Sequence, residues 1–259
     1  MAVMMMRAMA LAGLLSAGIA LAGCEGRKDL VAPQPQVTDT LRLVRSVPLT
    51  VPEPSDMCLD RDGLHWWTVS DNTGLVYKLR LSDCGVVQTL AYHGVDPEGI
   101  WQDPADGTFY VAEEGTREIV HLDAAGKVLS RVTVAGLGGE SNSGLEGITS
   151  GPVTGRFYVT QEKNPARLVE VDTAGTVLAL HGVDYVLDLS GVTYDPRVGQ
   201  LLVVSDESRK VCWTSLAGAL VSSWVIPVTK AEGVAIDTTR GRIYVVSDNE
   251  EKFYEFLMP

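Results

Sequence analysis

One phrase of sequence returns five times along this chain, and it restricts the fold more than any other feature. Its clearest copy, residues 231–249, reads as a short strand, a polar turn closed by Gly241, and a second strand that ends at Asp248. In the four regular copies, a glycine lies nine residues after the opening Glu or Ser. An acidic residue lies sixteen residues after the same opening residue. The five copies open at Ser55, Glu98, Glu146, Ser190 and Glu232.

Successive copies begin 42 to 48 residues apart. A period in that range, made of short strands, is typical of a β-propeller with four strands in each blade. The third copy continues with an expected third strand over 167–172, a turn at Gly175 and a fourth strand over 176–180. Short strands separated by glycine- and aspartate-bearing turns indicate an antiparallel meander. The sequence therefore predicts an all-β propeller.

The last copy contains only three strands before the chain ends at residue 259. The missing fourth strand is predicted at residues 40–49, because that segment resembles the fourth strands of other copies. Such a closure by the N-terminal strand removes the open sheet edge that a ring would otherwise leave. We therefore expect five blades within residues 39–259.

Residues 1–23 have the composition of a secretory signal. Arg7 gives a short positive region, and the apolar run that follows is 15 residues long, shorter than the ~20 residues of a membrane-spanning helix. The run ends in LAGC at 21–24, which resembles the bacterial lipobox, so we predict lipidation at Cys24. The alternative is an ordinary cleaved signal with an incidental cysteine. Residues 24–38 carry two prolines and mixed charges, and are expected to form a flexible tether.

The formal net charge of −12 restricts the partners. Such a chain repels nucleic acid and anionic lipid headgroups and attracts cations. We therefore expect no nucleic-acid partner, and contact with the membrane through the lipid anchor alone. Glu25, rather than an aspartate, follows the lipidated cysteine, which favours the outer membrane, facing the periplasm, in a cell with two membranes.

Three further cysteines, Cys58, Cys84 and Cys212, fall in an inner strand, an outer turn and a separate copy. A disulfide needs Cα atoms within ~7 Å of each other. We therefore expect three free thiols.

The repeat gathers carboxylates at one mouth of the propeller. Antiparallel first and second strands place the residue that opens the first and the acid that closes the second on the same face. Glu98, Glu146 and Glu232 should then lie at the axis, with an outer ring of Asp71, Glu114, Glu162, Asp206 and Asp248. Clustered carboxylates raise one another's pKa unless a cation intervenes, and Ca²⁺ takes six to eight oxygen ligands. We predict Ca²⁺ bound by the three inner glutamates. The outer ring is a candidate source of further ligands, although taken alone it favours salt bridges over metal ligation.

The alternative is a purely structural ring. In it, the inner glutamates would accept hydrogen bonds from neighbouring blades, and the outer acids would pair with Lys163, Arg209 and Lys252. The glycine that follows each regular opening residue lets the backbone approach the axis, since it lacks a Cβ. The first copy departs from this pattern, because Ser55-Asp56 replaces the Glu-Gly pair.

Several phrases resemble the SdiA-regulated, YjiK-type family of exported propellers, which is distantly similar to NHL-repeat propellers. They are DPEGI (96–100), GLEGIT (144–149), QEKNPARLVEV (161–171), LSGVTYDPRVGQLLVVSDESRKV (189–211) and the closing AEGVAID and IYVVSD segments. The resemblance covers nearly all of the chain after Cys24. It implies five blades and a shared Ca²⁺ site, but no established biochemical role.

Two classes of function stay open. The first is a membrane-anchored module that binds a small-molecule or protein ligand on the acidic face. The second is a Ca²⁺-dependent hydrolase, similar to lactonase or phytase-like propellers, in which the metal polarises an ester, lactone or phosphoester. A hydrolase needs a general base, either a free carboxylate or His93 and His181 of the repeated phrase HGVD. That repetition is equally consistent with a repeated turn.

Overall fold

The computed structural model describes residues 39–137, 144–151 and 155–259. All of them belong to one compact unit, Pro35–Pro259. The predicted signal, tether and lipidated Cys24 lie outside the described residues. Within those residues, no helix has the length and apolarity that a membrane crossing requires.

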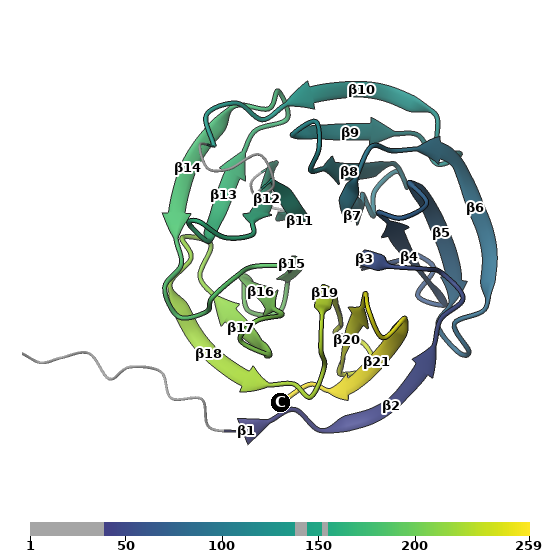
Figure 1. Ribbon diagram of the computed structural model, residues 1–259, viewed down its shortest axis with the longest axis vertical. Helices are drawn as coiled ribbons and strands as arrows, with labels where there is room; N and C mark the ends of the chain where they lie inside the picture. Colours follow the sequence, from purple (N-terminus) through teal and green to yellow (C-terminus); the bar gives the residue numbers. More distant parts are fainter. Residues whose placement is uncertain (1–38, 138–143, 152–154) are drawn as a thin grey trace, which may run out of the picture. The chain divides into compact units, whose positions relative to one another are not determined.

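Five blades, each with four antiparallel strands, surround a central axis (Figure 1), which confirms the predicted five-bladed propeller. Blade 1 consists of β3 (Pro54–Leu59), β4 (His65–Ser70), β5 (Leu75–Arg80) and β6 (Val86–His93). Blade 2 consists of β7 (Pro97–Gln102), β8 (Phe109–Glu113), β9 (Glu118–Leu122) and β10 (Val128–Thr133). Blade 3 consists of β11 (Leu145–Gly151), β12 (Arg156–Gln161), β13 (Arg167–Val171) and β14 (Val177–Gly182).

Blade 4 consists of β15 (Gly191–Asp195), β16 (Gln200–Ser205), β17 (Lys210–Thr214) and β18 (Leu220–Val225). Blade 5 consists of β19 (Ala231–Asp237), β20 (Arg242–Ser247), β21 (Lys252–Leu257) and β2 (Leu43–Pro48). The turn glycine predicted between the first and second strands of each blade has a positive φ, for example 81° at Gly107 and 64° at Gly241. Glycine adopts this conformation without a steric penalty.

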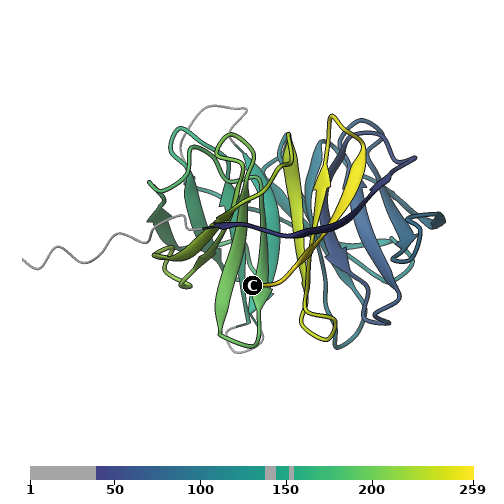
Figure 2. The same cartoon turned by 90° about the horizontal axis from the view of Figure 1, so that it is seen from below.

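The N-terminal segment closes the ring, as predicted. Strand β2 pairs antiparallel with β21, and Val47 lies opposite Phe253. The segment also does something that the sequence did not predict: β1 (Asp39–Thr40) pairs in parallel with β18 of blade 4. Between the two short strands, Leu41 is buried in the apolar core between blades 4 and 5. The expected strand 40–49 is therefore divided between two blades, and Figure 2 shows it crossing from one to the other.

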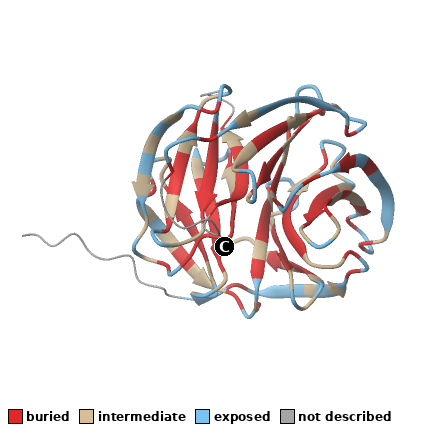
Figure 3. Cartoon of the chain, turned by 45° about the horizontal axis from the view of Figure 1, so that its top comes forward, coloured by how far each residue is buried: buried red, intermediate tan, exposed pale blue. Residues whose placement is uncertain are grey.

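The core lies in the interfaces between blades. Each interface holds an apolar cluster, so the second strand of a blade is covered on both faces, as at Leu201 and Leu202 of β16. At the interface of blades 5 and 1, the rings of Trp66 and Phe253 lie 5.3 Å apart. Figure 3 shows buried residues concentrated on inner strands and exposed ones on the outermost strands. Cys58, Cys84 and Cys212 are free thiols, as expected.

Candidate metal centre at the acidic mouth

A β-bulge aims the residue that opens the inner strand in blades 1, 2, 3 and 5. The pairing of the first and second strands shifts register between Pro97 and Gly99, and between Ala231 and Gly233. Equivalent shifts surround Glu146 and Ser55. A bulge leaves one residue out of the ladder and redirects its side chain. Glu98, Glu146 and Glu232 are thus released from strand alternation at the end of the sheet where the mouth forms.

In blades 2 to 5, the glycine after the opening residue is required by close approach of the inner strands. A Cβ added to Gly147 would lie 2.6 Å from the Cα of Gly191, and one on Gly233 would lie 2.6 Å from the Cα of Asp56. A Cβ cannot fit at that distance, and because the nearby atoms belong to the backbone, the neighbouring strand would have to move to make room for it. The glycines therefore draw the blades together and bring the opening glutamates to a common mouth.

In blade 1, the residue after the opening residue is an aspartate instead of a glycine, and its side chain lies against blade 2. Asp56 occupies the position that is glycine in the other blades, and it is fully buried. Its Oδ2 accepts a hydrogen bond of 2.9 Å from the N–H of Ile100 in blade 2. Burial raises the pKa of Asp56 well above its usual range. The departure in the first copy is thus a polar contact between blades.

A cavity of about 170 Å³ lies at the mouth, and one lysine is among the residues that line it. They are Ser55, Asp71, Glu98, Glu114, Glu146, Glu162, Lys230, Glu232 and Asp248. The cavity thus brings together all the carboxylates proposed from the sequence except Asp206. That residue lies next to it, with its Oδ2 3.9 Å from Nζ of Lys230.

Carboxylate oxygens converge most closely on the blade 2 side of the mouth. One oxygen from each of Asp96, Glu98 and Glu114 lies within 4.8 Å of the other two. Ca²⁺ holds its oxygen ligands at 2.3–2.6 Å, so ligands across one ion are separated by at most about 5 Å. Asp96 is exposed, whereas the two glutamates are half-buried. The cluster is thus compatible with a single cation that enters from solvent.

Burial and repulsion between like charges raise the pKa values of three carboxyl groups at the mouth. Burial, followed by the carboxylates of Asp71 and Asp96, raises the pKa of Glu98 to about 9. Burial and the neighbouring Glu98 raise the pKa of Glu146 well above its usual range. Glu114 also has a raised pKa, from burial and from Asp96, although the N–H of Gly144 donates to it at 2.9 Å and lowers that pKa. Burial and like charges thus disfavour the ionised forms of Glu98, Glu146 and Glu114, which a nearby positive charge would favour.

Lys230 supplies that charge on the opposite side of the mouth. Its Nζ lies 3.1 Å from Oε1 of Glu232. Burial disfavours the ammonium group, but the Glu232 carboxylate outweighs it and raises the pKa of Lys230. Burial also raises the pKa of Glu232, and Lys230 offsets part of that rise. The three inner glutamates are therefore not equivalent, since Glu232 already has a cation beside it.

A model of the SdiA-regulated family matches residues 52–257. The chain belongs to the SdiA-regulated family. Among solved structures, Myxococcus xanthus glutaminyl cyclase is similar to it with a TM-score of 0.67 and 15% identity, over 84% of this chain and 97% of the cyclase chain. A chain of a nidogen/laminin complex has a TM-score of 0.55 and 17% identity, over 76% of this chain and 73% of that one. Likeness at such identities concerns the fold, and says nothing of activity.

The outer acids of this SdiA-regulated propeller differ in their partners. Glu162 pairs with Lys163 at 2.7 Å, as the structural alternative expected. Lys252 pairs with Glu250 rather than with Asp248, and Lys230 rather than Arg209 approaches Asp206. One carboxylate oxygen of Asp248 is buried and has no hydrogen-bond partner among the described residues. The outer ring is therefore part ion-paired and part uncompensated.

Sequence reasoning missed two residues of the mouth, Asp96 and Lys230. Each lies two positions before an opening glutamate and has a positive φ, 57° for Asp96 and 48° for Lys230. Glu53 holds the equivalent position in blade 1 and also has a positive φ, 44°. The sequence did contain a signal, because the position two residues before the opening residue is charged in several copies. The sign of that charge differs between blades, however, so the position did not stand out as one kind of site residue. Only the spatial arrangement pairs Lys230 with Glu232 and Asp96 with Glu98.

The two histidines considered as bases do not line the mouth cavity. Nε2 of His181 lies 2.9 Å from Oε1 of Glu170 on the third strand of blade 3. His93 ends β6, where its ring would contact a Cβ added to Gly74. The repeated phrase HGVD thus ends the fourth strands of blades 1 and 3, which agrees with the repeated-turn interpretation.

Proposed function

We propose that this SdiA-regulated protein is an extracytoplasmic lipoprotein whose propeller binds Ca²⁺ at the acidic mouth and presents that face to a ligand. The observation that carries the proposal is the convergence of Asp96, Glu98 and Glu114 within 4.8 Å. Lys230 neutralises the other side of the same mouth. We therefore move the centre of the predicted site from the three inner glutamates toward blade 2, with Glu146 beside it.

The donor set fits this ion. All the groups are carboxylates, and Ca²⁺ prefers oxygen ligands in flexible numbers. A bound ion would keep the cluster ionised and would offer its remaining coordination positions to an anionic or carbonyl group of a ligand. Asp96, Glu98 and Glu114 would hold it, while Lys230 keeps Glu232 occupied.

Thermal melts with calcium and with chelator test the metal site. A ligand that binds only the folded state adds ~2.7 kcal/mol at a hundredfold excess over Kd. We therefore expect calcium to raise the melting temperature by about 5–10 °C for a domain of this size, and Glu98→Gln to abolish the difference. Glu162→Gln is the matched control, because Glu162 lines the same cavity but pairs with Lys163.

The same melts separate the alternatives. A structural ring without metal predicts that Glu98→Gln is stabilising to the same extent in calcium and in chelator, because it relieves repulsion. Loss of the calcium effect in Glu232→Gln as well would restore the site of three inner glutamates. A wild-type melting temperature that millimolar calcium does not move would refute calcium binding.

Proton release gives a second readout. Without a cation, the pKa of Glu98, which burial and neighbouring carboxylates raise to about 9, keeps that carboxyl group protonated at pH 7. A cation favours the ionised form, so binding displaces protons. Calcium added to the weakly buffered protein should lower the pH, and it should do so less in Glu98→Gln.

A calcium-dependent hydrolase is the second candidate. The observation that favours it is the buried carboxyl group of Glu146 beside the proposed metal site, since burial raises its pKa in the direction that suits a general acid. A panel of ester, lactone and phosphoester substrates, each with calcium and with chelator, distinguishes the two functions. We expect binding without turnover; calcium-dependent turnover lost in Glu98→Gln would favour the hydrolase.

The cellular location rests on the lipobox-like LAGC at 21–24. We expect Cys24→Ser to move the protein from the membrane fraction to the soluble exported fraction without changing its melting temperature. Cell fractionation of both forms measures this. An unchanged membrane fraction in the variant would mean that Cys24 carries no anchor.

A further inference from the structure

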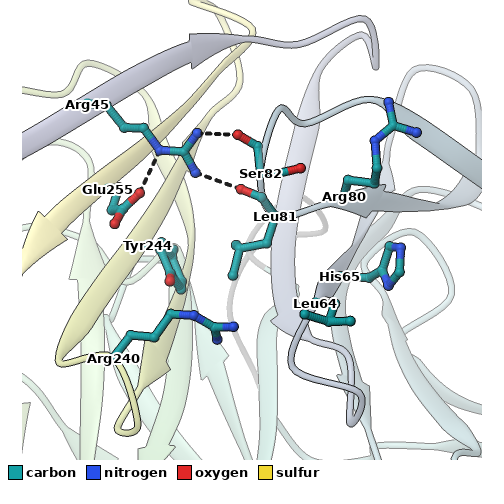
Figure 4. A pocket seen from close by; sticks show the side chains of 9 residues that line it. All are labelled: Arg45, Leu64, His65, Arg80, Leu81, Ser82, Arg240, Tyr244 and Glu255. Atoms are coloured by element: carbon teal, nitrogen blue, oxygen red, sulfur yellow. Dashed lines mark hydrogen bonds and ion pairs between the residues drawn. The ribbon is translucent and has the colours of Figure 1, made fainter.

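A second cavity, of about 620 Å³, lies between blades 5 and 1 (Figure 4). Its residues come from the turn after β3 and the start of β4, the end of β5 and the turn after it, the turn after β19, and the strands of blade 5. These turns lie at the end of the sheets opposite to the acidic mouth, because the mouth is formed where β3 and β19 begin. The lining residues are Arg45, Leu64, His65, Arg80, Leu81, Ser82, Arg240, Tyr244 and Glu255.

One row of paired residues forms the blade 5 wall. Tyr244 lies opposite Glu255, and Glu255 lies opposite Arg45 of the closing strand. Arg45 donates to Glu255 and to the backbone carbonyls of Leu81 and Ser82, each at 2.6 Å. Arg45 thus joins the closing strand to blade 1, and its guanidinium group is fixed in the cavity wall.

Arginines outnumber carboxylates among the residues that line this cavity. Glu255 is the shared acceptor of two guanidinium groups, Arg45 at 2.6 Å and Arg242 at 2.9 Å. Arg240 pairs with Asp237 and Arg80 pairs with Asp83. His65 and Asp62 form a further pair at 2.8 Å. Three arginines, Arg45, Arg80 and Arg240, therefore line the cavity with one carboxylate, Glu255. The carboxylates of Asp62, Asp83 and Asp237 pair with lining residues but do not line the cavity themselves.

The guanidinium groups of Arg240 and Arg80 remain accessible. Their side chains are 44% and 45% exposed, and Figure 4 shows Arg240 extending from the blade 5 wall toward blade 1. Between the two blades lie the apolar side chains of Leu64 and Leu81 and the ring of Tyr244. The cavity thus combines the N–H donors of arginine side chains with an apolar surface formed by Leu64, Leu81 and Tyr244.

We propose that this cavity binds a small organic anion, with a carboxylate or phosphate group on the arginines and an apolar body over Leu64, Leu81 and Tyr244. Guanidinium groups present paired N–H donors that match the geometry of both anions. The volume lies within the 300–1,000 Å³ typical of small-molecule sites. The site is independent of the proposed calcium site, since it lies at the opposite end of the propeller and uses none of the same residues.

Isothermal titration calorimetry with three probes of the same body tests the proposal. Benzoate and phenyl phosphate carry the anion, and benzyl alcohol is the neutral control. We expect saturable binding of at least one anion and at least tenfold weaker binding of benzyl alcohol. The affinities of the two anions then identify the preferred head group. Absence of saturable binding by either anion, or equal binding of benzyl alcohol, would overturn the proposal.

Arg240→Gln and Arg197→Gln form a matched pair of variants. Arg197 pairs with the buried Asp195 at 2.7 Å and is 42% exposed, in the corresponding turn of blade 4. We expect Arg240→Gln to weaken binding of the anion at least tenfold and Arg197→Gln to leave it unchanged. Arg80→Gln gives a second test at an exposed residue if Arg240→Gln lowers the melting temperature. Wild-type affinity in both cavity variants, or equal loss in Arg197→Gln, would refute this site.

Discussion

A chain from which residues 40–49 are deleted is expected to lose cooperative unfolding and to aggregate. The deletion removes Leu41 and Leu49, which are 4% and 7% exposed and belong to the cores on either side of blade 5. Each buried leucine contributes about 2–5 kcal/mol, and a whole domain is stable by about 5–15 kcal/mol. The deletion also exposes the edge of β21, which is an open template for strand pairing between molecules.

Deletion of residues 25–37 is the control, because it shortens the chain before β1 and leaves the closing strand intact. We expect this variant to unfold at the wild-type midpoint. Circular dichroism melts and light scattering of both deletions, in chains that start at Glu25 or later, measure the difference. A wild-type midpoint in the 40–49 deletion would show that the closing strand adds no stability to the ring.

Substitution of one axial glycine is expected to have the second-largest effect. In Gly147→Ala, the new Cβ would lie 2.6 Å from the Cα of Gly191 and 2.6 Å from the N of Val192. Both are backbone atoms of the neighbouring inner strand, so relief requires two blades to separate. Overpacking of this kind costs about 1–3 kcal/mol, and more where the backbone must move. We expect a loss of about 3 kcal/mol in the free energy of unfolding.

Gly182→Ala is the matched control, since a Cβ there meets no atom within 4 Å. We expect it to change the free energy of unfolding by less than about 0.5 kcal/mol. Urea titrations of the wild type and both variants measure these values. Equal midpoints for the wild type and Gly147→Ala would contradict the close packing of blades 3 and 4 at the axis.

The repeat itself determined much of this protein. The spacing of strands and turn glycines depends on short-range rules, alternation along strands and positive φ at turns. Those rules act within one copy, so five copies predicted five blades. Because the last copy has only three strands, the sequence also predicted that another segment supplies its fourth strand. The glycines after Glu98, Glu146 and Glu232 likewise indicated close approach before any contact between strands was known.

The arrangement between copies was decided by tertiary structure alone. The division of the closing segment between β1 and β2 depends on where Leu41 finds its core. At the mouth, the repeat made three glutamates look equivalent, but Lys230 sits beside one and Asp96 beside another. The cationic cavity joins Arg240 to Arg80, residues far apart in sequence. Charge balance at each place depends on distances between blades, which a repeat within one chain does not encode.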